Sequence, residues 1–348
     1  MEKVMRINLF LVVSTLIVFF KIAVAQTADD YVAPRTEWGQ PDLQGVWSFA
    51  TTTPLERRQR FGTREFLTPE EVEADFNSQT RRLKAANARE AELVVNPSAP
   101  EPGSVGGYNG FWFEGAGVEK NVRTSQIVYP PNGRLPARVE GAATHLPNLG
   151  DDVPGERPVL AMFGGISKDG PEDRGLSERC LVGFNAGPPF SADRFTYNAN
   201  VQIFQSKDHA VIMTEMVHDA RIVPLDGRNH LDEDLEFWSG DSRGYWEDDT
   251  LVVTTKNLSG LTASFSRYGT AKDKTLTERF TRIDAYTIDY EWTLDDPSTF
   301  TDKITAIVPM AKVDGQLYEY ACHEGNHAMA FLLRGERLAE QQQLEVGN

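Results

Sequence analysis

The chain has 348 residues, of which 35 are Lys or Arg and 51 are Asp or Glu, so its formal net charge at pH 7 is −16. Such an acidic chain is repelled by polyanions, which disfavours nucleic acid and anionic membrane surfaces as partners. We therefore expect a small-molecule ligand or substrate as the partner. The charge leaves the oligomeric state open.

Residues 1–25 have the pattern of a secretory signal peptide. Two basic residues precede an apolar run over residues 7–20, and Ala23-Val24-Ala25 has the small-residue spacing of a cleavage site. The run is too short for a convincing membrane span, and Gln26 stands where a lipid-anchored protein would carry Cys. We expect a periplasmic or secreted protein without a membrane anchor.

Residues 26–110 are expected to pack on the main domain. They contain a first strand at 42–49, a polar helix over 68–93 and then a linker rich in Pro, Gly and Ser. Thr68 is the N-cap of the helix, and Glu71 completes a capping box three residues later. One large domain or two smaller ones both fit this length.

Residues 111–348 read as an antiparallel β-domain with a short C-terminal helix from Ala328. Apolar and polar residues alternate between turn signals such as Asp314-Gly315. The fold class is mainly β, an antiparallel meander closed into a lipocalin-like barrel, with a β-sandwich as the alternative. The principal strands are expected at residues 201–205, 210–217, 220–225, 251–256, 276–283, 287–294, 304–310 and 317–322.

Four motifs resemble those of a family of secreted bacterial proteins of unassigned function. They are WGQPDLQGVW at 38–47, HDARIVPLDGR at 218–228, GDSRGYWE at 240–247 and YEYACHEGN at 318–326. The resemblance implies architecture and supplies no chemistry. Gly45-x-Trp47 also looks like the opening strand of lipocalin-type barrels.

The segment His323-Glu324-Gly325-Asn326-His327 satisfies the H-E-x-x-H pattern of zinc proteases. That pattern requires a helix, because histidines at i and i+4 must share one face to bind the same ion. Gly and Asn disfavour a helix at the two interior positions, and few residues remain to supply a third ligand. We interpret the segment as a strand end followed by a turn, and we expect His327 to be dispensable for any metal binding.

The alternation of side chains predicts ionisable groups on inward faces of the β-domain. Glu278 lies between Leu276 and Phe280 on one face, and Glu324 shares a face with Cys322. His218 shares a face with three residues of the expected strand at 210–217. Inward ionisable groups indicate either a polar pocket or buried ion pairs.

We therefore place a pocket near the mouth of the β-domain. The candidate substrate-binding residues are Arg221, Glu278 and Tyr320, and the alternative for Glu278 is a buried ion pair with Arg221 or Arg279. No cofactor is expected, although zinc or another divalent metal bound by His218 and His323 is a second hypothesis. The candidate catalytic residues are His218, Glu324, Asp219 and His323.

Two further features concern structure more than chemistry. Cys180 and Cys322 are the only cysteines, and an oxidising compartment favours a disulfide between them, with two free thiols as the alternative. Residues 241–244 are interpreted as a turn held by an Asp–Arg pair, and His230 is expected in an exposed loop.

Three classes of function remain open. The first is an extracytoplasmic enzyme, a lyase, isomerase or hydrolase, that applies acid–base chemistry to a small, partly apolar molecule. The second is a metal-dependent enzyme, and the third is a binding protein for an apolar ligand. Metal analysis separates the second class from the others, and a pocket without a His–carboxylate contact favours the third.

Overall fold

The computed structural model describes most of the chain, and Ala33–Asn348 form one compact unit. The expected signal peptide and the linker after the first helix lie outside the described residues. Within the described part, no helix is long and apolar enough to cross a membrane. The described residues are 31–95, 120–144, 168–184, 186–191 and 197–346.

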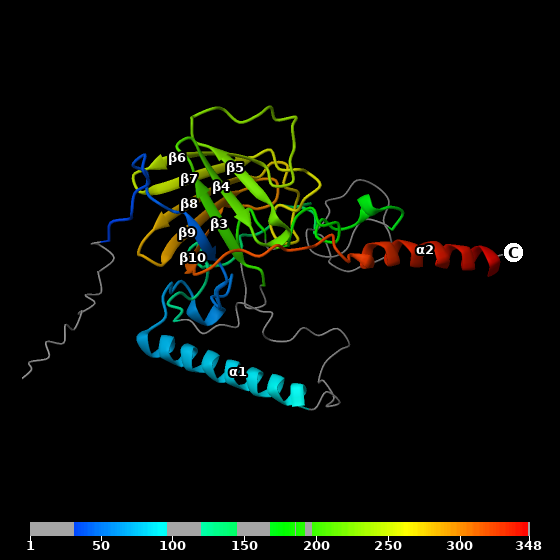
Figure 1. The fold of residues 1–348 in the computed structure, drawn as a ribbon, viewed down its shortest axis with the longest axis horizontal. Coiled ribbons are helices and arrows are strands. Elements are labelled where there is room, and N and C mark those ends of the chain that lie inside the picture. The colour runs from blue at the N-terminus through cyan, green and yellow to red at the C-terminus, as the bar shows by residue number, and fades with distance from the viewer. Residues whose placement is uncertain (1–30, 96–119, 145–167, 185, 192–196, 347–348) are drawn as a thin grey trace, which may run out of the picture. The chain divides into compact units, whose positions relative to one another are not determined.

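Ten strands form one antiparallel sheet that curls into a nearly closed barrel (Figure 1). The hydrogen-bonded order is β5-β4-β3-β1-β10-β9-β8-β7-β6, and β2 pairs with β10. The expected barrel is therefore confirmed. The strands are β1 (Gly45–Ser48), β2 (Ile127–Tyr129), β3 (Asn200–Gln205), β4 (His209–Thr214), β5 (Ala220–Pro224), β6 (Asp241–Glu247), β7 (Thr250–Lys256), β8 (Thr275–Arg282), β9 (Thr287–Asp295) and β10 (Ile304–Val313).

The barrel approaches closure where β5 meets β6, the two ends of the hydrogen-bonded order. Gly244 on β6 makes this approach feasible, because a Cβ added there would lie 2.8 Å from Val223 and 2.8 Å from Leu225. Val223 belongs to β5, and Leu225 directly follows this strand. A side chain at residue 244 would therefore push the two edges apart.

The barrel interior is filled by large side chains that alternate along the strands. In β9, Ile288, Tyr290, Trp292 and Leu294 are fully buried. The ring of Tyr290 lies 4.9 Å from that of Phe280 and 5.5 Å from that of Phe190. This period-two burial is the pattern expected for a strand with one face toward the core.

The described residues contain two α-helices: α1 (Pro69–Val95) lies between β1 and β2 in sequence, and α2 (His327–Val346) follows β10. The expected capping box of α1 is present: Glu71 donates its amide to Thr68 Oγ1 at 3.3 Å, and Thr68 donates its amide to Glu71 Oε2 at 2.9 Å. Helix α2 begins one residue earlier and runs further than expected. It contains no buried residue.

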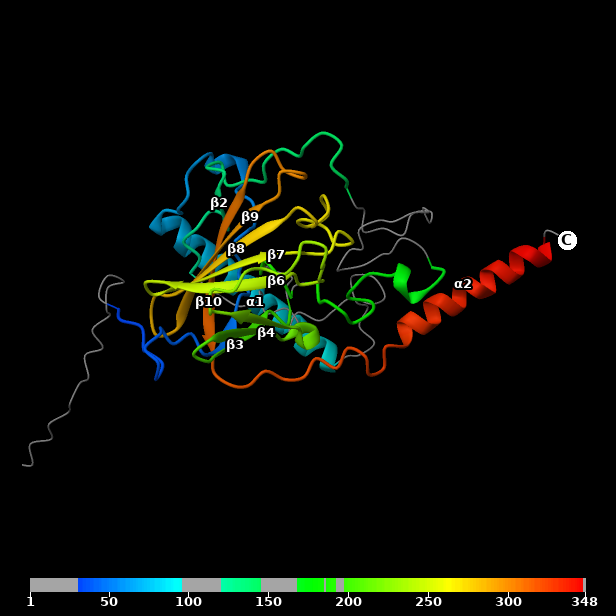
Figure 2. The same cartoon turned by 90° about the horizontal axis from the view of Figure 1, so that it is seen from above.

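The structure corrects the expected strand at 317–322. Strand β10 ends at Val313, and the following residues are extended but do not join the sheet, as Figure 2 shows for the segment between β10 and α2. Tyr318, in the middle of this segment, is 82% exposed. Alternation alone does not make a strand, because the backbone also needs a partner edge.

Candidate functional site

A buried ion pair joins opposite walls of the barrel interior. Arg221 of β5 donates to both carboxylate oxygens of Glu278 on β8, at 2.5 and 2.9 Å. The hydroxyl of Tyr290 donates to Glu278 Oε1 at 2.8 Å and accepts the amide of Phe190 at 3.1 Å. The inward position of Glu278 is confirmed, and Arg221 is its partner.

The electrostatics of this ion pair favour the charged form of Arg221. Burial alone would lower the pKa of Arg221, but the adjacent Glu278 carboxylate outweighs burial and raises that pKa. Burial, with the Glu278 charge, raises the pKa of the Tyr290 hydroxyl well above its ordinary value, so it stays a neutral donor. The other candidate partner, Arg279, instead pairs with Glu247.

His218 lies in a short turn and not in a strand. Strand β4 ends at Thr214, and a single 3-10 turn, η6 (Met216–His218), leads into β5. Val217 and His218 both have left-handed backbones, with φ values of 61° and 46°. This turn breaks the alternation of β4, so His218 is exposed although it was expected on the inward face.

Asp219, the next residue, is half-buried and fixed by a neighbouring loop. The hydroxyl of Ser239 donates to Asp219 Oδ2 at 2.5 Å. Since one carboxylate oxygen is held in this way, the Asp219 side chain has a defined position beside the His218 turn.

The predicted disulfide between Cys180 and Cys322 is present, with an S–S distance of 2.08 Å. It attaches the segment after β10 to the loop around Cys180. Asn326 Nδ2 adds a second attachment, donating to the carbonyl of Glu178 at 3.0 Å. The disulfide and this hydrogen bond attach the segment to the loop although it does not join the sheet.

A surface pocket of about 280 Å³ lies beside this disulfide. Two of the predicted site residues, Tyr320 and Glu324, line it. Glu178 also lines the pocket and is not among the predicted site residues. Its carboxylate accepts from Arg174 at 3.2 Å and from the amide of Gly175 at 2.9 Å. The lining residues are Ser177, Glu178, Tyr320, Ala321, Cys322, Glu324, Gly325 and Asn326.

The H-E-x-x-H segment does not have the geometry of a zinc protease. Helix α2 starts at His327, so His323 lies outside it and the two imidazoles do not share a helical face. Gly325 has a φ of 74°, which is a turn conformation. Among the described residues, no group of three His, Cys, Asp or Glu side chains is arranged to hold a metal ion.

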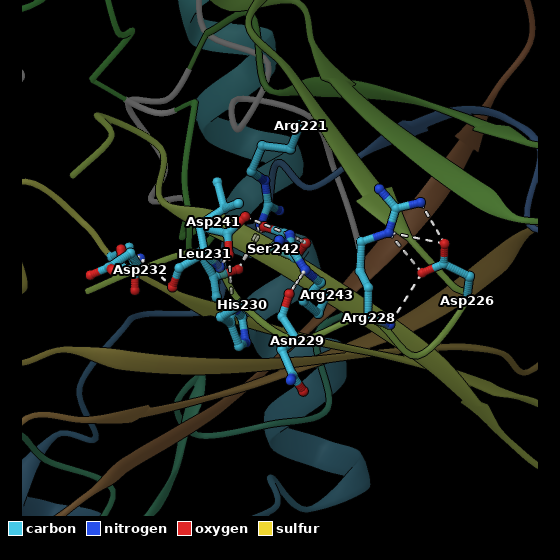
Figure 3. Close-up of polar contacts among 12 residues, drawn as sticks. Arg221, Asp226, Arg228, Asn229, His230, Leu231, Asp232, Asp241, Ser242 and Arg243 are labelled. Atoms are coloured by element: carbon cyan, nitrogen blue, oxygen red, sulfur yellow. Dashed lines mark hydrogen bonds and ion pairs between the residues drawn. The ribbon is translucent and has the colours of Figure 1, made fainter. Parts of the chain in front are cut away.

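A second polar cluster covers the outer face of β6, and Figure 3 shows its residues. Asp241 Oδ2 contacts His230 Nδ1 at 2.9 Å and accepts the amide of Leu231 at 3.0 Å, while Oδ1 accepts from Arg243 at 2.5 Å. The predicted Asp–Arg pair is confirmed, but it lies in a strand instead of a turn. Asp241 anchors the loop that carries His230, which is only partly exposed.

The structure thus divides the predicted site residues into groups. Arg221 and Glu278 meet in the interior, and Tyr320 and Glu324 meet at the surface pocket. His218, with Asp219 beside it, lies in its own turn, and His323 is exposed after the disulfide. Comparison with known protein families, curated proteins and solved structures found no match.

Proposed function

We propose that the protein is an extracytoplasmic enzyme that applies acid–base chemistry to a small molecule, with His218 and Glu324 as the reacting pair. The observation that carries this proposal is the left-handed backbone of Val217 and His218. A β-branched residue with positive φ is a conformational outlier. Such strain persists where the surrounding structure imposes it, and it concentrates at functional sites.

A series of contacts links the segments that carry these two residues. Met216 precedes the strained pair and packs against Gly183, where an added Cβ would lie 2.4 Å from Met216 Cγ. Gly183 is three residues from Cys180, and Cys180 is bonded to Cys322, two residues before Glu324. The same loop therefore contacts the His218 turn and the pocket segment.

The chemistry of the pocket restricts the substrate. Glu178 and Glu324 bring two carboxylates to it, and Arg174 neutralises only the first in part. A neutral or cationic molecule fits this charge better than an anion. Tyr320 supplies an aromatic surface for a partly apolar substrate.

Each residue has a specific role in the proposal. His218 exchanges a proton with the substrate, and Glu324 provides the second acid–base group. Asp219, held by Ser239, fixes the turn that carries His218. We assign Arg221 and Glu278 to the interior framework, since both are buried.

We also place the protein in an oxidising compartment such as the periplasm, where its disulfide can persist.

The test is turnover of neutral and cationic esters, lactones and glycosides by wild type and by His218→Ala and Glu324→Gln variants. We expect each variant to lose about 100-fold in turnover while its melting temperature stays within about 1 °C. His209→Ala is the matched control, because His209 lies on β4 beyond the turn. Variants as active as wild type would refute the assigned pair.

The two alternative functions make different predictions. A metal-dependent enzyme that uses His218 and His323 would copurify with a stoichiometric divalent ion, measurable by elemental analysis. A binding protein would retain ligand affinity without any turnover. The strained backbone at Val217 and His218 fits either enzyme, because both use His218, and it has no role in a binding protein without chemistry.

A further inference from the structure

Four polar side chains are buried together at the end of the barrel where β8 begins and β9 ends. Because Thr275 pairs with Asp295, the next residues outward, Lys274 and Asp296, lie opposite one another. Lys274 Nζ donates to the carbonyl of Ser264 at 3.0 Å. The four residues and their exposed fractions are Ser264 at 1%, Lys274 at 5%, Trp292 at 0% and Asp296 at 1%.

Aromatic rings form a wall beside these polar groups. Phe265, the neighbour of Ser264, lies against Trp292 with ring centroids 5.3 Å apart. On β8 and β9, Glu278 is the cross-strand partner of Trp292. The cluster therefore continues inward to the buried ion pair, and it shares no residue with the surface pocket.

Three atoms of this cluster lack a hydrogen-bond partner within the described residues: Ser264 Oγ, Trp292 Nε1 and Asp296 Oδ2. The other oxygen of Asp296 is satisfied, because Oδ1 accepts from the amide and hydroxyl of Ser298. Buried polar atoms in native proteins are almost always paired, with protein or with an ordered guest. Three unpaired atoms on residues of one buried cluster indicate a missing partner.

We propose that this end of the barrel interior binds a buried, neutral guest that carries a hydroxyl group, either a bound water molecule or a small polyol. An indole N–H can only donate, a carboxylate oxygen can only accept, and a serine hydroxyl can do both. A hydroxyl group has the chemistry to pair with each of the three, because it both donates and accepts. A neutral guest also preserves the balance between the Lys274 and Asp296 charges.

Thr299 provides a matched control inside the same fold. Its Oγ1 is buried and also lacks a partner within the described residues, and its amide donates to the carbonyl of Asp296. However, a Cβ placed on Gly269 would lie 1.7 Å from Thr299 Oγ1, so this hydroxyl presses against backbone. No guest fits at Thr299 on that side.

The first test compares Ser264→Ala with Thr299→Val by urea unfolding. If a guest satisfies Ser264, removing its hydroxyl should lower the folding equilibrium constant about tenfold. Thr299→Val should leave the constant unchanged or raise it, because it removes an unsatisfied hydroxyl without changing the side-chain shape. A Ser264→Ala variant as stable as wild type would overturn the proposal.

The second test identifies the guest in the wild-type protein and in Ser264→Ala. A bound polyol gives a mass adduct in native mass spectrometry, restored by glycerol after denaturation and refolding, and absent in the variant. A bound water gives no adduct but appears as a long-lived water in ¹⁷O relaxation dispersion, again lost in the variant. Wild-type protein showing neither signal would overturn the proposal even if Ser264→Ala is unstable.

Discussion

The stability of the fold should rise as the pH is raised from 7 to 9.5, because Lys274 is buried as a cation. Burial lowers the pKa of Lys274 from 10.5 to about 8, although the Asp296 charge opposes this shift. In the unfolded chain the same amine keeps its proton up to about pH 10.5. Between the two values the unfolded state binds more protons, so the free energy of unfolding increases with pH.

The expected magnitude follows from the two pKa values. Each pH unit in this window adds about 1.4 kcal/mol, so unfolding at pH 9.5 should require roughly 2 kcal/mol more than at pH 7 from Lys274 alone. Above pH 10 the trend should reverse. There Tyr290, whose pKa is raised in the fold, holds a proton that the unfolded chain has lost.

Urea unfolding at a series of pH values, on wild type and on Lys274→Met, measures this effect. The variant should lack the rise between pH 8 and 9.5. Lys207→Met is the matched control, since Lys207 is exposed and its removal should leave the rise intact. Parallel pH profiles for wild type and Lys274→Met would refute the assignment of the effect to the buried amine.

Three further predictions concern the turn, the ion pair and the disulfide. His218→Gly should raise the free energy of unfolding by about 0.5–1 kcal/mol, because the strain energy that glycine removes from a left-handed backbone exceeds the added entropy of the unfolded chain. His218→Ala should not raise it. Equal stability of the two variants in urea would contradict the strain. Glu278→Gln should cost about 3–5 kcal/mol in the same assay by leaving the Arg221 charge buried without its partner, and a change under 1 kcal/mol would show that the pair is dispensable. Thiol titration of denatured, unreduced protein should find no free Cys180 or Cys322, and reduction should lower stability by up to about 4–5 kcal/mol on the chain-entropy account; two titratable thiols would exclude the bond.

The barrel and its interior could be predicted from the sequence because alternation is a local property. Every second residue is buried in β9 and in β8 as far as Phe280, so the inward position of Glu278 followed from its neighbours alone. The partner of Glu278 could not be predicted in the same way. Arg221 reaches Glu278 across the interior from β5, and two arginines were compatible with the same local pattern.

The candidate site was harder to predict because it depends on departures from regular structure. Side-chain alternation predicts an inward His218 only if the strand continues past Thr214. The left-handed backbones of Val217 and His218 are incompatible with such a strand. The inward position predicted for Glu324 depended on a strand at 317–322, and that strand does not form because the segment has no partner edge. Its position beside Glu178 instead follows from the disulfide, whose cysteines are 142 residues apart in sequence.

The interior and the pocket therefore depend on different interactions. Arg221, Glu278 and Tyr290 are buried and mutually satisfied, which suits a framework that must keep its charges fixed. The pocket segment has no sheet pairing, and the disulfide and the Asn326 contact attach it to the loop around Cys180. Because the strands fix the framework and the pocket segment lies outside the sheet, residues around Glu324 can change without loss of the barrel, which is the arrangement expected of a scaffold that carries a separate functional site.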